Sequence, residues 1–317
     1  MLKGSARVHT LLSSDALGLA SLEARLKARR SDRTRATAQE LMRRLATMAA
    51  ATQALRLGPV TLKPAQIALE TSLSIVIQDL KPILPGHLLV APKRQVERYT
   101  DLTPEEGDDL ADAMRRAQQL APTADAYNVA LKDGKSAGQP VAHVHAHVVP
   151  RRRGDLAHND EIYGLIDHWT PDDQAAPVTL DVPDDASRKP RSEEDMAAEA
   201  TRYRRRCDPF PDSSENVLFG RFLVLNSQVF FESDTCRALV NLKPLVEGHV
   251  LVVPKDVVPT LGELSDARHR DLWRAARRVH SLITEEYGAT GANIAVQDGV
   301  HAGQSVPHAH VHVLPRH

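Results

Sequence analysis

The sequence predicts an α+β fold in which two similar domains follow one another, each with an antiparallel meander sheet and one principal helix. An internal repeat and a regular series of short apolar runs lead to this prediction. Lys81–Lys93 reappears as Lys243–Lys255 at an offset of 162 residues, and a histidine-rich segment recurs at an offset of 165. Because two separate motifs recur in the same order at nearly the same distance, the chain contains a duplicated domain.

Length indicates how many domains the chain can hold, and composition excludes several classes of protein. With 317 residues, the chain is long enough for two domains that each bury a core. We expect a basic extension over 1–55, a first domain over 56–168, a linker and tail helix over 169–213, and a second domain over 214–317. A net charge of −1 and 4% aromatic residues argue against nucleic acid as the main partner. No apolar run is long enough for a membrane span, and two cysteines are too few for a disulfide framework.

The first 56 residues carry 11 basic and 4 acidic side chains. Such a segment is typical either of a mitochondrial presequence or of a solvated basic helix in front of the fold. Thr37 and Glu40 form a capping box that predicts a helix start. We expect a cytoplasmic protein, with mitochondrial targeting through the extension as the alternative.

Each copy is predicted to run strand, strand, helix, strand, strand. Short apolar runs between proline, glycine and aspartate predict the strands. These runs lie at 73–77, 86–90, 128–131 and 293–296. Thr103, Pro104 and Glu106 predict the start of the principal helix in the first copy, and Ser265 predicts it in the second. A tight glycine turn is then expected to lead into the last strand.

The last strand of each copy is expected to carry three histidines at alternate positions. They are His143, His145 and His147 in the first copy and His308, His310 and His312 in the second. Side chains at alternate positions of a strand share a face, so each triad is expected to present three imidazoles together.

Three interpretations of this pattern compete. One is a histidine-rich buried strand without chemistry, and another is a zinc site, since His-x-His on a strand is a good chelate. No carboxylate or cysteine nearby completes a zinc ligand set. The third is nucleophilic catalysis on phosphorus, because a neutral imidazole is a good nucleophile near neutral pH and covalent capture divides one hydrolysis into two easier steps. We favour the third, since the Gly-Gln loop before each triad offers N–H donors for developing charge.

The triads resemble those of the histidine triad (HIT) superfamily of nucleotide hydrolases and transferases, and most closely its fragile-histidine-triad branch, the diadenosine triphosphate hydrolases. The likeness extends to Gly154–Tyr163 and Arg191–Ala200 and covers most of the chain. It implies two HIT-type domains that form an intramolecular pseudo-dimer with a continuous sheet. It also implies a dinucleoside polyphosphate hydrolase that cleaves diadenosine triphosphate to AMP and ADP through a nucleotidyl-histidine. The alternatives are a nucleotide-binding signalling module with slow hydrolysis, a related nucleotidyl hydrolase or transferase, and a zinc hydrolase.

The resemblance also implies roles for individual residues. His310 and His145 would be the nucleophiles, supported from behind by His249 and His87. The substrate-binding residues expected in the second copy are Asn241, Gln297, Gly303, Gln304, Ser305, Val306, His308 and His312. Those expected in the first copy are Asp79, Gly138, Gln139, Val141, His143 and His147, although His143 and His308 also suit a supporting role. A divalent cation, Mg or Mn, is expected to arrive with the dinucleoside polyphosphate or other nucleotide, with no metal held by the protein. Association of chains beyond the internal pseudo-dimer is left open.

The two copies differ at three polar positions. Asp79, Lys132 and Pro140 stand where the second copy has Asn241, Gln297 and Ser305. Proline lacks both a hydroxyl and a backbone N–H, whereas an aspartate still accepts a hydrogen bond from a ribose hydroxyl. We therefore expect His310 to carry most of the turnover.

Overall fold

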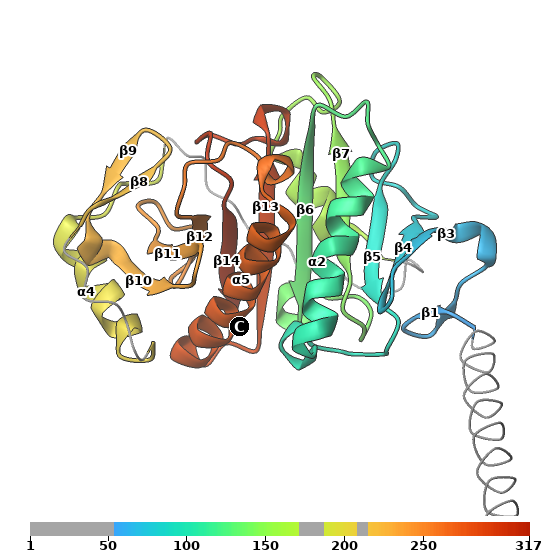
Figure 1. Ribbon diagram of the computed structural model, residues 1–317, viewed down its shortest axis with the longest axis horizontal. Helices are drawn as coiled ribbons and strands as arrows, with labels where there is room; N and C mark the ends of the chain where they lie inside the picture. The colour runs from blue at the N-terminus through green and yellow to red at the C-terminus, as the bar shows by residue number, and fades with distance from the viewer. Residues whose placement is uncertain (1–53, 171–186, 208–214) are drawn as a thin grey trace, which may run out of the picture. The chain divides into compact units, whose positions relative to one another are not determined.

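A single ten-stranded antiparallel sheet runs through both repeats (Figure 1). Its strand order is β10-β11-β12-β14-β13-β6-β7-β5-β4-β3. The strands of the first repeat are β3 (Ile67–Glu70), β4 (Ser74–Gln78), β5 (Leu88–Pro92), β6 (Ala126–Asp133) and β7 (Ala146–Arg151). Those of the second are β10 (Val229–Glu232), β11 (Cys236–Val240), β12 (Val250–Pro254), β13 (Gly291–Asp298) and β14 (Val311–Arg316). The continuous sheet predicted for an intramolecular pseudo-dimer is confirmed.

The computed structural model describes residues 54–170, 187–207 and 215–317. The predictions made for the basic extension, including the helix start at Thr37, lie outside these residues, as do 171–186 and 208–213 of the predicted linker and tail helix. Within them, no helix combines the length and apolar character needed to cross a membrane.

The repeats are joined by the pairing of β6 with β13. These strands pair antiparallel over seven residue pairs, from Asp133 opposite Ala292 to Tyr127 opposite Asp298. The sequence of β13 alternates, so Ile294 and Val296 belong to the buried apolar core while Gln297 is half-buried on the other face. One face of the central sheet is therefore apolar and the other carries polar side chains.

Two helices lie side by side against the apolar face (Figure 1). They are α2 (Pro104–Gln119) and α5 (Asp266–Tyr287). The predicted capping box of α2 is confirmed, since Thr103 Oγ1 accepts from Glu106 N at 3.2 Å and Glu106 Oε2 accepts from Thr103 N at 2.9 Å. Ser265 caps α5 as predicted.

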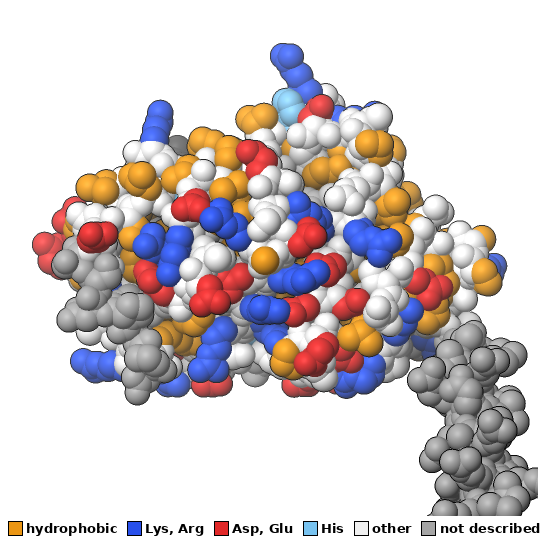
Figure 2. Space-filling model, viewed as in Figure 1, with side chains coloured by type: hydrophobic (Ala, Val, Ile, Leu, Met, Phe, Trp, Pro, Cys, Tyr) orange, Lys and Arg blue, Asp and Glu red, His pale blue; other side chains and the backbone are white. Residues whose placement is uncertain are grey.

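Ion pairs connect the exposed sides of these two helices. Arg270 contacts Asp112 at 2.7 Å, and Arg274 pairs with Asp108. In Figure 2, basic and acidic side chains are interspersed over the region where the helices lie. Exposed pairs of this kind contribute about 0–1 kcal/mol each, so the buried apolar core beneath them holds the helices in place.

The sheet order explains how the histidines reach the centre of each repeat. The chain passes from β5 through α2 to β6, and β7 then returns to the place between them. β14 occupies the equivalent place between β12 and β13. The last histidine of each triad therefore lies beside the strands that join the two repeats.

The prediction that each triad lies wholly in a strand is wrong for its first part. β14 begins at Val311, so only His312 of the second triad lies in the strand. The preceding residues form a turn, in which His308 N donates to Val306 O at 2.8 Å and Ala309 N donates to Val258 O at 2.7 Å. Because these N–H groups bond within loops, they are not available to a neighbouring strand. A short 3₁₀ turn at Val300–Ala302 likewise takes the place of the predicted tight turn.

Each repeat also begins with a short hairpin that the sequence analysis missed. The first consists of β1 (Arg56–Leu57) and β2 (Val60–Thr61), and the second of β8 (Val217–Phe219) and β9 (Phe222–Val224). Strands of two or three residues are too short to show a period. Gly220 turns the second hairpin with φ +59°, in the left-handed region that favours glycine.

Two further helices follow β7. They are α3 (Glu161–His168) and α4 (Glu193–Arg204), the latter being the predicted tail helix with Ser192 as its cap. Helix α4 packs against β10 and β11, which belong to the second repeat. The segment that follows the first repeat therefore becomes part of the surroundings of the second.

Candidate active site

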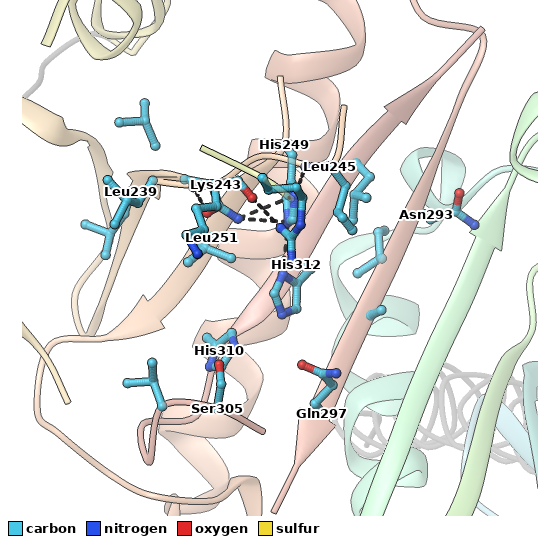
Figure 3. A pocket seen from close by; sticks show the side chains of 18 of the residues that line it. Leu239, Lys243, Leu245, His249, Leu251, Asn293, Gln297, Ser305, His310 and His312 are labelled. Carbon is cyan, nitrogen blue, oxygen red and sulfur yellow. Dashed lines mark hydrogen bonds between the residues drawn. The ribbon is translucent and has the colours of Figure 1, made fainter. Parts of the chain in front are cut away.

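A cavity of about 730 Å³ opens over the polar face of the second repeat. The second triad supplies His310 and His312 to its wall, and Figure 3 shows His312 lying between His310 and His249. The first repeat contributes Lys132 and Tyr163 to the same wall. The cavity therefore belongs to the second triad but is completed by the first repeat.

The ring of His310 is held with one nitrogen occupied and the other available. Its Nδ1 lies 2.7 Å from the carbonyl oxygen of His308, so Nδ1 must carry the proton and donate it. Burial lowers the pKa of His310 below its usual value, which keeps the imidazole neutral near pH 7. Nε2 then has a free lone pair at the cavity wall, which is what a nucleophile requires.

A chain of hydrogen bonds fixes the opposite proton arrangement on His312. Leu245 N donates to His249 Nδ1 at 3.1 Å, so His249 must carry its proton on Nε2. This Nε2 donates to His312 Nδ1 at 2.9 Å, as drawn in Figure 3. The proton of His312 therefore lies on Nε2, an atom that has no partner within the protein. His312 thus offers the cavity a donor, where His310 offers a lone pair.

Burial keeps this relay uncharged. It lowers the pKa of His249 to about 3 and the pKa of His312 well below its usual value.

The first member of the triad, His308, lies behind the cavity wall. Its Nδ1 accepts from Gly220 N at 3.1 Å and its Nε2 donates to Pro254 O at 3.1 Å. His308 therefore links the β8–β9 hairpin to the sheet and does not line the cavity.

The other residues expected in the second copy divide into two groups. Asn241, Gln297, Ser305 and Val306 line the cavity, whereas Gly303 and Gln304 do not. The amide of Gln304 is used inside its loop, accepting from Gly299 N and donating to Pro259 O, both at 2.8 Å. It shapes the loop that presents Ser305.

Several lining residues were missed by the sequence analysis. Phe219 places its ring 5.2 Å from that of His310, and Arg191 donates to the carbonyl oxygen of Asn241 through Nε and Nη2 at 3.1 and 2.7 Å. A signal for Phe219 existed, since Gly220 repeats Gly58 at the offset of 162 that relates the two copies. Nothing in the repeat signals Arg191, because it follows the first repeat and contacts the second.

The first triad has the same frame but different surroundings. All three of its histidines are fully buried, and His145 Nδ1 donates to His143 O at 2.8 Å, as in the second copy. Burial, together with the nearby charge of Lys132, lowers the pKa of His145 to about 4. His143 likewise lies behind the site, where Nε2 contacts Pro92 O at 2.9 Å.

The exchange of Asn241 for Asp79 disturbs the hydrogen-bond chain of the first copy. Asp79 Oδ2 lies 2.9 Å from His87 Nδ1, the atom that also accepts from Ile83 N at 3.3 Å. A carboxylate oxygen and a lone pair repel each other at this distance unless a proton lies between them. Placing that proton on Nδ1 leaves His87 either charged or unable to donate to His147 Nδ1, 3.0 Å away. In the second copy the corresponding group is the amide nitrogen of Asn241, 3.4 Å from His249 Nδ1, and an N–H group does not repel the lone pair on that atom.

The Gly-Gln loop before the triad of the first copy is also held by hydrogen bonds within the loop. Gln139 is used internally, accepting from Gly134 N at 2.6 Å, and Gly138 ends the short 3₁₀ turn in the left-handed conformation. Val141 is buried at the position of Val306. Lys132 is buried with Nζ donating to Ile166 O at 2.8 Å, and this burial lowers its pKa to about 8.

The geometry gives no support to the zinc interpretation. Across residues 54–170, 187–207 and 215–317, no three His, Cys, Asp or Glu side chains are grouped so that they could hold a metal ion. In each triad, Nδ1 of the middle histidine is bonded to a carbonyl oxygen and Nδ1 of the last to another histidine.

Comparison with known proteins decides the family. A model of the HIT domain matches residues 61–154 and 223–317, more than half of the chain. The chain belongs to the HIT family. Both copies are matched, which confirms the resemblance inferred from the triads.

Relatives within the HIT family carry related names. A bis(5'-adenosyl)-triphosphatase of Dictyostelium discoideum is 45% identical over 98 residues, covering 31% of this chain and 66% of the relative. An asymmetrical bis(5'-nucleosyl)-tetraphosphatase of Schizosaccharomyces pombe is 39% identical over 154 residues, covering 43% of this chain and 85% of the relative.

Among solved structures, the NitFhit protein of C. elegans shares 41% identity over 34% of this chain and 26% of its own, with a TM-score of 0.33. A GalT-like protein of Arabidopsis thaliana shares 15% identity over 77% and 74%, with a TM-score of 0.46.

The free energy of unfolding is expected to fall as the pH is lowered from about 6.5 to about 4. Burial lowers the pKa of His145, His269 and His308 to about 4, so on acidification the unfolded chain binds protons that the folded protein excludes. Above the ordinary histidine pKa of 6.5 both states are neutral, and this stability is fully present. Asp298 opposes the trend, because burial raises its pKa to about 6, but it is a single group. Urea unfolding at pH 7 and pH 5 measures the change, and a higher midpoint at pH 5 would contradict it.

Proposed function

We propose that the chain hydrolyses dinucleoside polyphosphates at the cavity over His310, in the simplest case cleaving diadenosine triphosphate to AMP and ADP. The observation that carries this proposal is that the two imidazoles carry their protons on different nitrogens. His310 Nε2 offers a lone pair, and His312 Nε2 offers an N–H group. The names of the relatives, bis(5'-adenosyl)-triphosphatase and bis(5'-nucleosyl)-tetraphosphatase, support the substrate class.

The two ends of the cavity suit the two parts of a nucleotide. Phe219, Leu239 and Leu251 make one end apolar, as a nucleobase requires. Asn241 lines the cavity beside His249, with its amide nitrogen 3.4 Å from His249 Nδ1, and its amide suits a ribose hydroxyl. Ser305 and Gln297 lie close to His310 in Figure 3 and face the phosphate chain.

The reaction then proceeds in two steps. His310 Nε2 attacks the α-phosphorus, a P–N bond forms, and the P–O bond to the leaving nucleotide breaks. Water next attacks the same phosphorus, the P–N bond breaks, and the mononucleotide leaves with His310 restored. The Nε2–H of His312 donates to a non-bridging oxygen while negative charge grows on it, and one such donor typically lowers a barrier by ~2.7–4 kcal/mol. Ser305 Oγ donates to the departing oxygen.

The cavity continues past the histidines toward the first repeat. Asn293, Arg316 and Lys132 line this part, and Arg316 Nη1 donates to Asn293 Oδ1 at 3.0 Å. Two cationic side chains suit the negative charge of a leaving nucleotide. A cavity of this length supports a dinucleotide substrate better than a mononucleotide.

His310→Asn is expected to lower kcat at least 10³-fold and to abolish covalent labelling. Asparagine retains a polar side chain but has no ring nitrogen that can bond to phosphorus. Mass spectrometry of the enzyme quenched during turnover measures the adduct, which is expected on His310 in the unaltered chain. His301→Asn is the matched control, because His301 does not line the cavity. An adduct that persists in the His310 variant would refute the proposed nucleophile.

Asn241→Asp is expected to lower kcat about 10²-fold, the typical effect of losing one donor to the transition state. The substitution places a carboxylate beside His249, as Asp79 lies beside His87 in the first copy, and so opposes the neutral donor state of His312. Steady-state kinetics measure the effect. Gln119→Glu makes the same chemical change at an exposed position of α2 and serves as the control. Equal kcat values for the two variants would rule out the proton arrangement assigned to the relay.

A divalent cation, Mg²⁺ or Mn²⁺, is proposed to enter with the phosphates of the substrate, as hard cations commonly do. Exhaustive chelation is expected to stop hydrolysis, and Mg²⁺ alone is expected to restore it. Rates measured after stepwise addition of Mg²⁺ or Zn²⁺ to the chelated enzyme separate this proposal from a zinc hydrolase. Recovery with Zn²⁺ but not with Mg²⁺ would favour the zinc enzyme.

A further inference from the structure

We propose that the indole of Trp169 fills the nucleoside subsite of the first repeat, so that each chain has one substrate site, over His310. This inference rests on the proposed function, because the subsite in the first repeat is assigned by its correspondence with the cavity of the second. It goes beyond that function because it assigns a side chain of the protein itself to the subsite of the first repeat.

The apolar end of the cavity has an exact counterpart in the first repeat. Phe219, Leu239 and Leu251, which line the cavity, correspond at the offset of 162 to Leu57, Ile77 and Leu89. The latter three form one buried cluster together with Trp169. The same three wall positions therefore enclose an open space in the second repeat and an indole ring in the first.

The indole also reaches the histidines. Its ring centroid lies 4.8 Å from that of His147, 5.6 Å from that of His145 and 6.5 Å from that of His87. Trp169 is only 6% exposed, and its Nε1 has no hydrogen-bond partner among the described residues. Packing alone thus holds this flat aromatic group in a space whose counterpart suits a nucleobase.

The backbone beside Trp169 closes the polar side of the same site. Trp169 directly follows α3 as its C-cap, and its N–H donates to Ile166 O at 3.2 Å. The same carbonyl oxygen accepts from Lys132 Nζ at 2.8 Å. Lys132 stands where the second repeat has Gln297, so one short segment fills the apolar part of the first site and also bonds the side chain at a polar position.

The opposite side of this segment serves the second repeat. Tyr163, Ile166 and Asp167 of α3 line the cavity over His310. Seating Trp169 in the first site therefore fixes a wall of the second. The first repeat acts as a support for the active site of the second and does not provide an active site of its own.

Isothermal titration with AMP tests the inference. The unaltered chain is expected to bind one AMP, and Trp169→Ala is expected to bind two, the second more weakly because Asp79 and Lys132 remain in place. Leu165→Ala is the matched control, since Leu165 is an exposed residue of the same helix, and it is expected to bind one. Trp169→Leu, which keeps an apolar side chain of smaller size, replaces the alanine variant if that variant does not fold.

The possible results separate the two proposals. Two AMP molecules bound by the unaltered chain would overturn the inference while leaving the proposed function intact. One AMP molecule bound by a folded Trp169 variant would also overturn it, since the indole would then not be what excludes the nucleotide. No binding to the unaltered chain at millimolar AMP would refute the proposed nucleotide chemistry, and the inference with it.

Discussion

The pairing of β6 with β13 is the constraint on which the other features of this structure depend. Its seven residue pairs place the two repeats in one sheet with their polar faces on the same side. An edge strand left unpaired would invite association with other chains, and this pairing covers one edge of each repeat with the other. It also brings α3 and Lys132 of the first repeat to the cavity over His310.

Small changes of side chain give two similar frames different hydrogen-bonding surroundings. The backbone bonds that orient His145 and His310 agree within 0.1 Å. The difference lies behind these histidines, where a carboxylate oxygen faces Nδ1 of His87 and an amide nitrogen faces Nδ1 of His249. Since a buried imidazole has two neutral forms, a single neighbouring atom decides which nitrogen carries the proton. Asparagine and aspartate have nearly the same shape, so this change leaves the fold intact.

What could be predicted from the sequence is what depends on local pattern or on repetition. The cap at Thr103 and Glu106 uses atoms three residues apart, and the duplicated segments reveal the paired domains directly. The relation between Trp169 and His147 could not be predicted, because neither repetition nor spacing connects residues of a helix end and a distant strand. The resemblance implied that Gln304 binds substrate, but both ends of its amide form hydrogen bonds within the loop. The β8–β9 hairpin, and Phe219 with it, is too short to show a periodic signal.

The contact between Arg191 and the carbonyl oxygen of Asn241 has a consequence for how the site is assembled. Arg191 follows the first repeat along the chain and donates two hydrogen bonds to the residue directly after β11 in the second. Between separate subunits, such a contact would form only when the subunits associated, and so would depend on their concentration. A covalent connection replaces that encounter with a local concentration set by the length of the linker. The pocket wall that Arg191 braces is therefore complete in a solitary molecule, however dilute the solution.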